Sequence, residues 1–494
     1  MTRPAVGLLA VVGLLAALVG VATELPAGVP VPAAATAVPV VGRTAVCPDV
    51  RQDAGLASRV AVGVVPLTGA TKGDVVLREL DAAGGQAPVP VARGGDVALD
   101  LAGSVSEGGV VVRASGPSAG GLEVEQVTRG PGPAVRGLAV LQCAAPTADT
   151  WFVGGSAATG SATTLVLANP DSADAVVDVT AWSAQGPVDP RAGEGVVVPA
   201  DARTLVALQD LAPGRDLLAV RVTAARGRVV PALRHERGGA AGLDWVPASL
   251  PPDRLVVLPG LPQGPGARSV QISNPGREDA AVELQLTGVD GQLAPPELAG
   301  VVVPAGTSVT RDLTAETAAG ALAVAVTSSG PPVLAVALVE DGTGGPVRDI
   351  AYAGAAGPLT GPALVPEVAV GPDTTSALLL SALGVDGEVV VTALPVPGTV
   401  GPLPSPRTLP VPGGRTVALR LAELLPPGAQ TRFAVSVSPA PGSGPVHVAR
   451  SWQEAGPQRS VTALRGGTSE VTRPAVRADP AAGTRAPGPV PQPR

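Results

Sequence analysis

The feature that most constrains the fold of this chain is a repeat with a period of about 105 residues. The phrase Leu-Val-Leu-Ala-Asn-Pro-Asp around Asn169 returns as Val-Gln-Ile-Ser-Asn-Pro-Gly around Asn274. Downstream, Gly195-Val-Val-Val-Pro-Ala returns as Gly300-Val-Val-Val-Pro-Ala in the same register. A long period with a fixed internal order indicates tandem domains.

Within each unit the pattern is that of short strands separated by turns. Ala175–Trp182 alternates apolar and polar residues around Asp178 and Thr180, as a half-buried strand does. The chain holds 64 glycines and 55 prolines, and these residues stand at most of the breaks between Val-rich runs. Asn169 and Asn274 each end such a run before a proline, so we interpret them as turn residues and not as repeated binding sites.

We predict an all-β fold of tandem immunoglobulin-like β-sandwich modules, after an N-terminal apolar helix and before a disordered C-terminal tail. The units are too long for propeller blades, which span roughly 40–50 residues. The predicted boundaries are 1–37 for a signal peptide or membrane anchor, 45–147 for a divergent sandwich closed by a disulfide, 150–247, 253–352 and 360–465 for three further sandwiches, and 466–494 for the tail.

The N-terminal segment predicts export. Ala5–Ala22 carries no charge over 18 residues and follows Arg3. A transmembrane helix needs ~20 residues and a signal-peptide core ~7–15, so cleavage and retention as an anchor both stay open. In either case the remaining chain is expected outside the cytoplasm, secreted or held at the cell membrane.

Cys47 and Cys143 are the only cysteines, and they bracket the divergent first module. In an exported protein two such cysteines are expected to form a disulfide. Two free thiols or a metal site are the alternatives, although no further residues with ligand spacing lie nearby.

Composition and motifs exclude several functions. The net charge of −7 argues against a nucleic-acid partner, which a basic stripe would indicate. Gly116-Pro-Ser-Ala-Gly matches a nucleophile elbow, but the strand-to-helix context of that motif is missing. His235 and His447 stand in different modules without further ligands nearby. We therefore predict no catalytic residue, no cofactor and no metal.

Two groups of residues remain as candidates for packing or binding. Trp151 and Phe152 stand where one module passes to the next, and we interpret them as an interdomain or partner contact. A glutamate recurs near the last strand of each unit, as a solvated strand end or as a shared binding carboxylate; these are Glu125, Glu236, Glu340 and Glu454. Four aspartates near the junctions are too dispersed along the chain to predict a calcium site: Asp244, Asp253, Asp341 and Asp349.

The chain resembles a known family in its Cys47-Pro pair, in Cys143, in Trp151-Phe-Val-Gly-Gly and in the phrase ending at Asn169. That family consists of large secreted or membrane-anchored actinobacterial proteins classified as a domain of unknown function. The resemblance spans about residues 40–465 and implies no activity or cofactor. Members often lie beside cell-envelope glycosyltransferases, which suggests a role in the envelope.

Two functional hypotheses follow. The first is a non-enzymatic exported scaffold or adhesion protein of the cell envelope, whose sandwich loops bind an envelope glycan or protein. The second is a polysaccharide-processing enzyme, or an accessory subunit of an envelope glycosyltransferase system. An enzyme should gather polar groups with shifted pKa values in one cleft, whereas a scaffold should not.

Overall fold

The computed structural model describes residues 36–50, 56–65, 73–80, 89–93, 99–100, 108–131, 136–238, 241–341, 348–454, 456, 458–468 and 470–473. The chain divides into two compact units. The smaller unit joins the two ends of the chain, since β1 (Thr36–Pro39) pairs antiparallel with β37 (Glu470–Arg473). The larger unit spans Val40–Ser469.

The predicted disordered tail is therefore wrong for Glu470–Arg473, which form a strand. The partner of this strand lies more than 400 residues away in the sequence, so no local pattern could indicate the pairing. The apolar run Ala5–Ala22 and the remaining tail residues 474–494 lie outside the described residues. In the described part of the chain, no helix has the length and apolar character needed to span a membrane.

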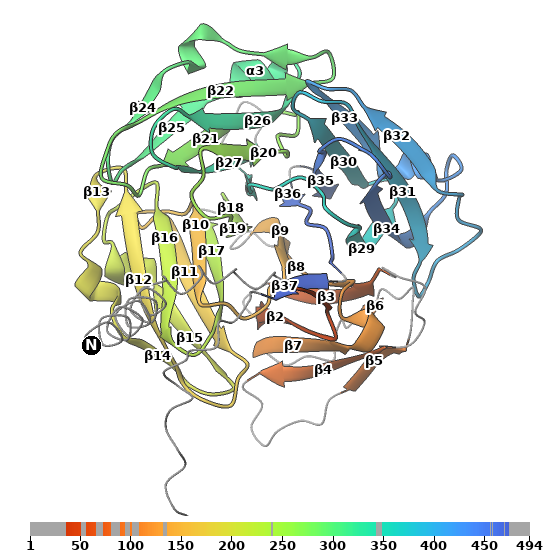
Figure 1. The fold of residues 1–494 in the computed structure, drawn as a ribbon, viewed down its shortest axis with the longest axis horizontal. Helices are drawn as coiled ribbons and strands as arrows, with labels where there is room; N and C mark the ends of the chain where they lie inside the picture. The colour runs from red at the N-terminus through yellow and green to blue at the C-terminus, as the bar shows by residue number, and fades with distance from the viewer. Residues whose placement is uncertain are drawn as a thin grey trace, which may run out of the picture. The chain divides into compact units, whose positions relative to one another are not determined.

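The all-β prediction is confirmed, since 60% of the described residues lie in strands and 6% in helices. The second module, residues 149–249, shows the plan most completely (Figure 1). Its strands are β10 (Asp149–Val153), β11 (Ser161–Asn169), β12 (Ala175–Ser183), β13 (Gly186–Pro187), β14 (Val196–Val198), β15 (Ala202–Ala207), β16 (Ala219–Arg226), β17 (Val230–Arg237), β18 (Gly242–Val246) and β19 (Ala248–Ser249). They form two antiparallel sheets, one around β10-β16-β12 and the other in the order β15-β11-β17-β18.

The other three modules repeat this pairing order. The first module, residues 42–142, contains β2 (Gly42–Val50), β3 (Ala57–Val64), β4 (Asp74–Leu80), β5 (Val89–Arg93), β6 (Leu99–Asp100), β7 (Gly108–Ser115), β8 (Leu122–Pro131) and β9 (Arg136–Gln142). The third, residues 255–353, contains β20 (Leu255–Leu258), β21 (Arg268–Ser273), β22 (Ala280–Gly288), β23 (Gln292–Leu293), β24 (Val301–Val303), β25 (Ser308–Asp312), β26 (Ala321–Ser328), β27 (Leu334–Asp341) and β28 (Asp349–Ala353).

The fourth module, residues 363–463, contains β29 (Ala363–Val370), β30 (Thr374–Ala382), β31 (Gly387–Pro395), β32 (Arg407–Val411), β33 (Arg415–Arg420), β34 (Thr431–Pro439), β35 (His447–Glu454) and β36 (Gln458–Ala463). Short helical turns join strands in the modules, namely η1 (Gly116–Ser118), η2 (Pro190–Gly193), α2 (Leu208–Leu211), η3 (Pro296–Leu298), α3 (Thr314–Ala318) and η4 (Leu421–Leu424).

The pairing order does not confirm the immunoglobulin-like part of the prediction. In the immunoglobulin order A-B-E-D, the second strand lies between the first and the fifth. Here the second strand β11 lies between β15 and β17, and the first strand β10 lies beside β16 instead of β11. Alternation and turn residues predict how many strands exist and which face is apolar, but pairing partners depend on tertiary packing.

Each module has an apolar core between its two sheets. In β12, the residues from Ala175 to Ser183 alternate strictly between buried and partly buried. Its inward residues, such as Val177 and Val179, share one cluster with Leu165 of β11 and Leu233 of β17. The predicted half-buried pattern of this strand is thus confirmed, and Val, Leu and Ala supply most of its core.

One strand of each module is buried on both faces, namely β8, β17, β27 and β35. In β27, Ala335, Ala337 and Val339 belong to the core of the third module. The alternate residues Leu334 and Val336 belong to the cluster of the second module. A strand covered on both sides reads as a continuous apolar run, which explains the sequence Leu-Ala-Val-Ala-Leu-Val.

The same arrangement links all four modules of the larger unit into a closed cycle. β17 packs against the first module through Val230 and Ala232, and β35 packs against the third through Ala449. β8 packs against the fourth through Val127, which meets Trp452. The last strands β9, β18, β28 and β36 contact one another in turn, and Figure 1 shows three of them labelled near the centre of the view.

Two glycines allow the last strands to approach closely. Gly137 of β9 has φ +150°, and a Cβ there would lie 2.8 Å from the carbonyl oxygen of Leu243. Gly242 of β18 has φ +120°, and a Cβ there would lie 2.5 Å from the backbone nitrogen of Ile350. Side chains at either position would force the first, second and third modules apart.

Candidate ligand-binding site between the four modules

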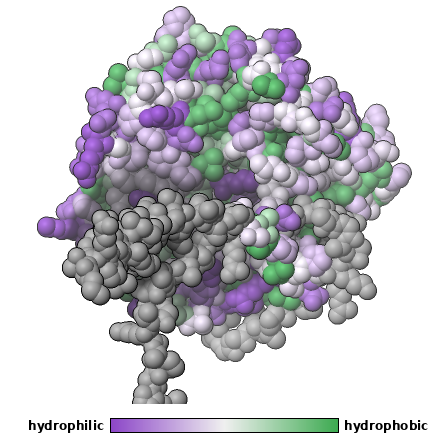
Figure 2. Space-filling view, in the orientation of Figure 1, coloured by the Kyte–Doolittle hydropathy of each residue, from purple (hydrophilic) through white to green (hydrophobic). Residues whose placement is uncertain are grey.

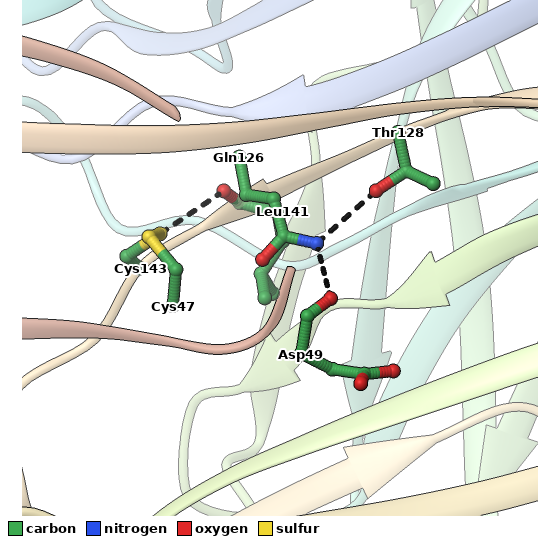
Figure 3. Close-up of a disulfide and its surroundings, with 6 residues drawn as sticks. All are labelled: Cys47, Asp49, Gln126, Thr128, Leu141 and Cys143. Carbon is green, nitrogen blue, oxygen red and sulfur yellow. Dashed lines mark hydrogen bonds between the residues drawn. A yellow bond between two sulfur atoms is a disulfide. The ribbon is translucent and has the colours of Figure 1, made fainter. Parts of the chain in front are cut away.

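The predicted disulfide is confirmed. Cys47 of β2 and Cys143, directly after β9, are joined with a Cα–Cα distance of 4.7 Å (Figure 3). Beside it, the Gln126 Nε2 donates hydrogen bonds to the backbone oxygen of Asp49 at 2.9 Å and to the Thr128 hydroxyl at 3.1 Å. The disulfide and these bonds fix the end of β2, which carries the Asp49 side chain.

Asp49 joins the first module to the second. Its carboxylate is buried and forms ion pairs with Arg203 of β15 and Arg234 of β17. Arg234 also pairs with Glu236 at 2.8 Å. Two guanidinium groups from one module therefore enclose a single carboxylate from its neighbour.

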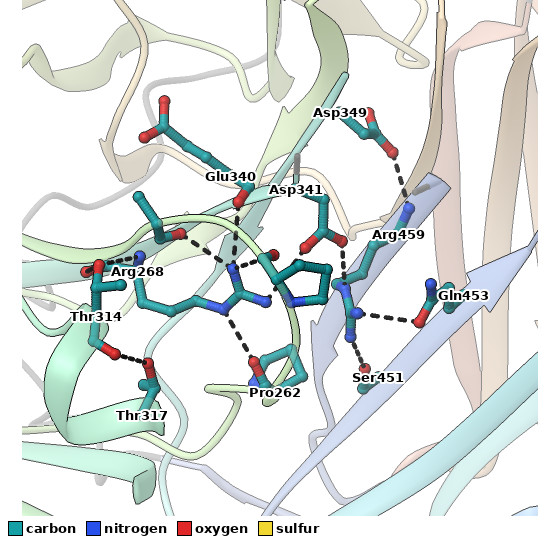
Figure 4. A network of polar contacts seen from close by, with 12 residues as sticks. Pro262, Arg268, Thr314, Thr317, Glu340, Asp341, Asp349, Ser451, Gln453 and Arg459 are labelled. Atoms are coloured by element: carbon teal, nitrogen blue, oxygen red, sulfur yellow. Dashed lines mark hydrogen bonds and ion pairs between the residues drawn. The ribbon is translucent and has the colours of Figure 1, made fainter. Parts of the chain in front are cut away.

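A second polar network joins the third module to the fourth (Figure 4). Asp341, at the end of β27, lies 3.2 Å from Arg268 and 2.6 Å from Arg459 of β36. Arg268 is 1% exposed and also donates to the backbone oxygens of Pro262, at 3.0 Å, and Glu340, at 3.2 Å. Burial lowers the pKa of Arg268, and Asp341 opposes this shift.

Ion pairs also close the cycle between the fourth module and the first. Arg450 of β35 lies 3.2 Å from Glu125 of β8, and these side chains are 1% and 6% exposed. Glu454 accepts two hydrogen bonds of 2.7 Å from Arg129. Trp452 lies between the two arginines, with its ring centroid 4.2 Å from the Arg450 guanidinium and 5.2 Å from that of Arg129.

Three of the four recurrent glutamates form ion pairs between modules. Glu125, Glu340 and Glu454 each pair with an arginine of a neighbouring module; the partner of Glu340 is Arg237 of the second module. Glu236 pairs within its own module. Glu125, Glu340 and Glu454 are therefore interface residues, whereas Glu236 lies at a partly exposed strand end. A pattern within one module could not reveal partners in another.

The two histidines have structural partners. The His235 Nδ1 lies 2.7 Å from the Tyr352 hydroxyl of the third module, and that hydroxyl accepts a hydrogen bond from the Gly155 N–H at 3.0 Å. Burial, together with nearby Arg237, lowers the pKa of His235 to about 4. His447 lies 2.9 Å from the carbonyl oxygen of Ala356, and burial lowers its pKa.

Three of the aspartates that are dispersed in the sequence come close in space. Asp349 interacts electrostatically with both Asp244 and Asp341, and burial raises the pKa of Asp244 and Asp349 well above the ordinary range. The Asp349 carboxylate accepts from the backbone N–H groups of Arg459 at 2.8 Å and Ile350 at 2.9 Å. Among the described residues, no group of three or more His, Cys, Asp or Glu could hold a metal ion.

A pocket of about 80 Å³ lies where the four modules meet. Its apolar floor is buried and includes Val140, Phe152, Trp245, Ala355 and Val461, which come from all four modules. Its rim is more open and includes Gln142, Pro247, Thr462 and Arg465. The pocket therefore exists only in the assembled cycle.

One positively charged group lines this pocket. Arg465 is exposed and donates a hydrogen bond of 2.8 Å to the carbonyl oxygen of Ala248. Nearby, Glu123 interacts with both Arg465 and Arg43, and Arg43 lies 3.8 Å from it. Burial raises the pKa of Glu123 to about 7.

Trp151 and Phe152 are buried in one cluster with residues of the second and third modules. The Trp151 ring stacks on Trp182 at 5.4 Å, and Arg221 lies 4.9 Å above its centroid. Phe152 points to the opposite face of β10 and lines the central pocket. A contact of these two residues with a partner stays a prediction.

A family model described as "Family of unknown function (DUF5719)" matches residues 98–422. This match covers well over half of the chain. The chain belongs to this family. None of the curated proteins compared with the chain matches it. The DUF5719 match extends across parts of all four modules, and the function of the family is unknown.

The sequence did not point to the central pocket, because its lining comes from four distant segments. A usable signal was present in the last strands of the modules. Asp244 and Trp245 lie inside the short apolar strand β18, and Asp349 and Tyr352 lie in the short strand β28. Polar groups inside short apolar strands indicate that both faces of the strand contact protein.

Proposed function

We propose that this DUF5719 protein is a non-enzymatic, exported scaffold of the actinobacterial cell envelope, which binds an envelope glycan or protein. The observation that carries the proposal is that each boundary in the cycle of modules contains an arginine–carboxylate pair. Such pairs, together with apolar interfaces, favour a rigid body that holds its loops at fixed positions. Preformed surfaces lose less conformational freedom on binding.

The location of the residues with shifted pKa values supports a binding role over catalysis. His235, Tyr352, Asp244 and Asp349 are all buried and contact neighbouring modules. A catalytic cleft would instead expose such groups to substrate. On the face drawn in Figure 2, hydrophobic and hydrophilic residues are interspersed, as on a surface that stays in water.

Export is supported by the uncharged run Ala5–Ala22 and by the disulfide, which is typical of oxidising compartments. Fractionation of cells that express the full chain with a C-terminal epitope should place it in the medium or the membrane fraction. Recovery in the cytoplasm with both cysteines alkylatable would contradict export.

Cross-linking in intact cells, followed by purification of the epitope and mass spectrometry, tests the binding role. We expect envelope glycan fragments or an envelope protein to copurify with the chain. They should not copurify with a control protein that is exported by the same leader. Equal recovery with both would refute the scaffold.

The alternative is a polysaccharide-processing enzyme or an accessory subunit of a glycosyltransferase system. Incubation of the purified full chain with isolated envelope polysaccharide distinguishes them. Release of reducing ends that is lost in a carboxylate variant such as Glu123→Gln would favour the enzyme.

A further inference from the structure

The central pocket differs from the ion-paired interfaces around it, since its walls are largely apolar and its volume of about 80 Å³ remains open. One water molecule occupies ~10–15 Å³ on the same measure, so the pocket holds a group of several heavy atoms. Phe152 and Trp245 contribute aromatic surface to the floor. Apolar floors with a few polar rim groups are typical of small-molecule sites.

The rim determines which charge the ligand carries. Among the described residues, Arg465 is the one charged side chain that lines the pocket, and the Ala248 carbonyl accepts a hydrogen bond from one of its N–H groups. Glu123 interacts electrostatically with Arg465 but does not line the pocket itself. An anionic group at the rim is therefore favoured over a neutral or cationic one.

We propose that the central pocket binds a small amphiphilic carboxylate, with its hydrocarbon chain on the floor and its carboxylate at Arg465. A chain of about four to eight carbons matches the pocket volume, since each CH₂ occupies roughly the space of a water molecule. Because the walls come from all four modules, the bound acid contacts each of them. This proposal is independent of export and of the envelope partner.

Hexanoate is the probe for the test, with hexan-1-ol as its neutral match. The purified full chain is titrated with each by calorimetry and by tryptophan fluorescence, because Trp245 lines the floor. A Trp245→Phe variant identifies the signal of this residue. We expect saturable one-to-one binding of hexanoate, at least tenfold tighter than binding of the alcohol. The difference corresponds to one charge-assisted hydrogen bond between the carboxylate and Arg465.

Three variants sharpen the test. Arg465→Gln keeps a donor for the Ala248 carbonyl but should weaken hexanoate about tenfold to the level of the alcohol. Glu123→Gln removes the competing carboxylate and should strengthen hexanoate binding. Ala463→Phe fills the rim and should abolish binding of both probes. Each variant is compared at an unchanged melting temperature, which excludes unfolding as the cause.

Equal affinity for hexanoate and hexan-1-ol in the natural chain would overturn the proposal. The same holds for unchanged hexanoate binding in Arg465→Gln, for unchanged binding in Ala463→Phe, and for a titration without saturation. Either of the latter two results would show that the probe binds elsewhere on the surface.

Discussion

Among single residues, Asn169 and Asn274 show what the repeated sequence does in the structure. The Asn169 side chain donates to the carbonyl oxygens of Ala173 at 2.8 Å and Val198 at 3.0 Å, and accepts from the Asp171 N–H. Asn274 makes the corresponding bonds to Glu278 and Val303. Both are fully buried, so each holds a turn against the neighbouring strand.

Asn169→Ala should destabilise the protein by about 1–3 kcal/mol, because buried backbone carbonyls lose their donor. Thermal unfolding measures the effect, and Asn274→Ala should match it. Ser172→Ala in the same turn is the control, since Ser172 is exposed. A similar loss of stability in Asn169→Ala and Ser172→Ala would contradict the role of the amide.

Asp244 provides a prediction of pH dependence. Its Oδ2 accepts from the Tyr352 N–H at 2.7 Å, whereas its Oδ1 has no hydrogen-bond partner among the described residues. Burial raises the pKa of this carboxyl in the folded state, so folding favours its protonated form. The resulting stabilisation is complete below the unfolded pKa of ~3.9 and is lost as pH rises through the folded value.

Urea unfolding at pH 5 and pH 8 tests this expectation. The natural chain should lose stability between the two values, by up to about 1.4 kcal/mol per pH unit from this group. Asp244→Asn keeps the acceptor for Tyr352 and cannot ionise, so it should lose less. Equal losses in both proteins would show that Asp244 does not titrate in this range.

At the scale of elements, strands that contact two modules carry both apolar and ionic contacts. β27 contributes one face to its own core and the other to the second module, and it ends in Asp341, which pairs with Arg459 of the fourth. One strand thus connects three modules. The residue pattern of the third module could predict β27 as a strand, but it could not predict which other modules β27 contacts.

Asp341→Asn should cost about 3–5 kcal/mol, because it leaves the buried Arg268 and the nearly buried Arg459 without their shared carboxylate. Chemical unfolding measures the cost. The control is Asp149→Asn, which breaks a pair with Arg221 whose side chains are 47% and 40% exposed. That variant should change stability by less than ~1 kcal/mol. A comparable change in both variants would argue against a specific interface role.

At the scale of the whole molecule, the larger unit is a closed cycle and not a row of independent sandwiches. Each module covers apolar surface of its neighbour, and the first and fourth modules also pair through Glu125 and Arg450. Removing one module would expose faces that are now buried. This mutual dependence favours unfolding of the four modules together.

Calorimetry should therefore show one main transition for the four modules, with similar calorimetric and van't Hoff enthalpies. Reduction of the Cys47–Cys143 disulfide, which closes a loop of 96 residues, should lower the stability by about 4–5 kcal/mol in the loop-entropy model. The transition should shift to lower temperature but stay single. Separate unfolding of the first module after reduction would contradict coupling through the cycle.

The sequence by itself determined the elements of this protein. The period of about 105 residues, the alternation in β12 and the turn phrases at Asn169 and Asn274 were enough to predict tandem β modules. Two cysteines around the first module were enough to predict the disulfide. These features are local or repeat at a fixed spacing. A strand or a module can therefore be predicted from its own residues alone.

Only the tertiary structure decided the strand pairing, the closure of the cycle and the central pocket. The pairing of β11 with β17 replaces the expected immunoglobulin order, and the pair of Glu125 with Arg450 joins residues 325 positions apart. The residues around Arg465 in the central pocket likewise come from all four modules. A strand is buried on both faces, and a charge finds a distant partner, only when two modules come into contact. The residue pattern within one module does not specify which modules are in contact.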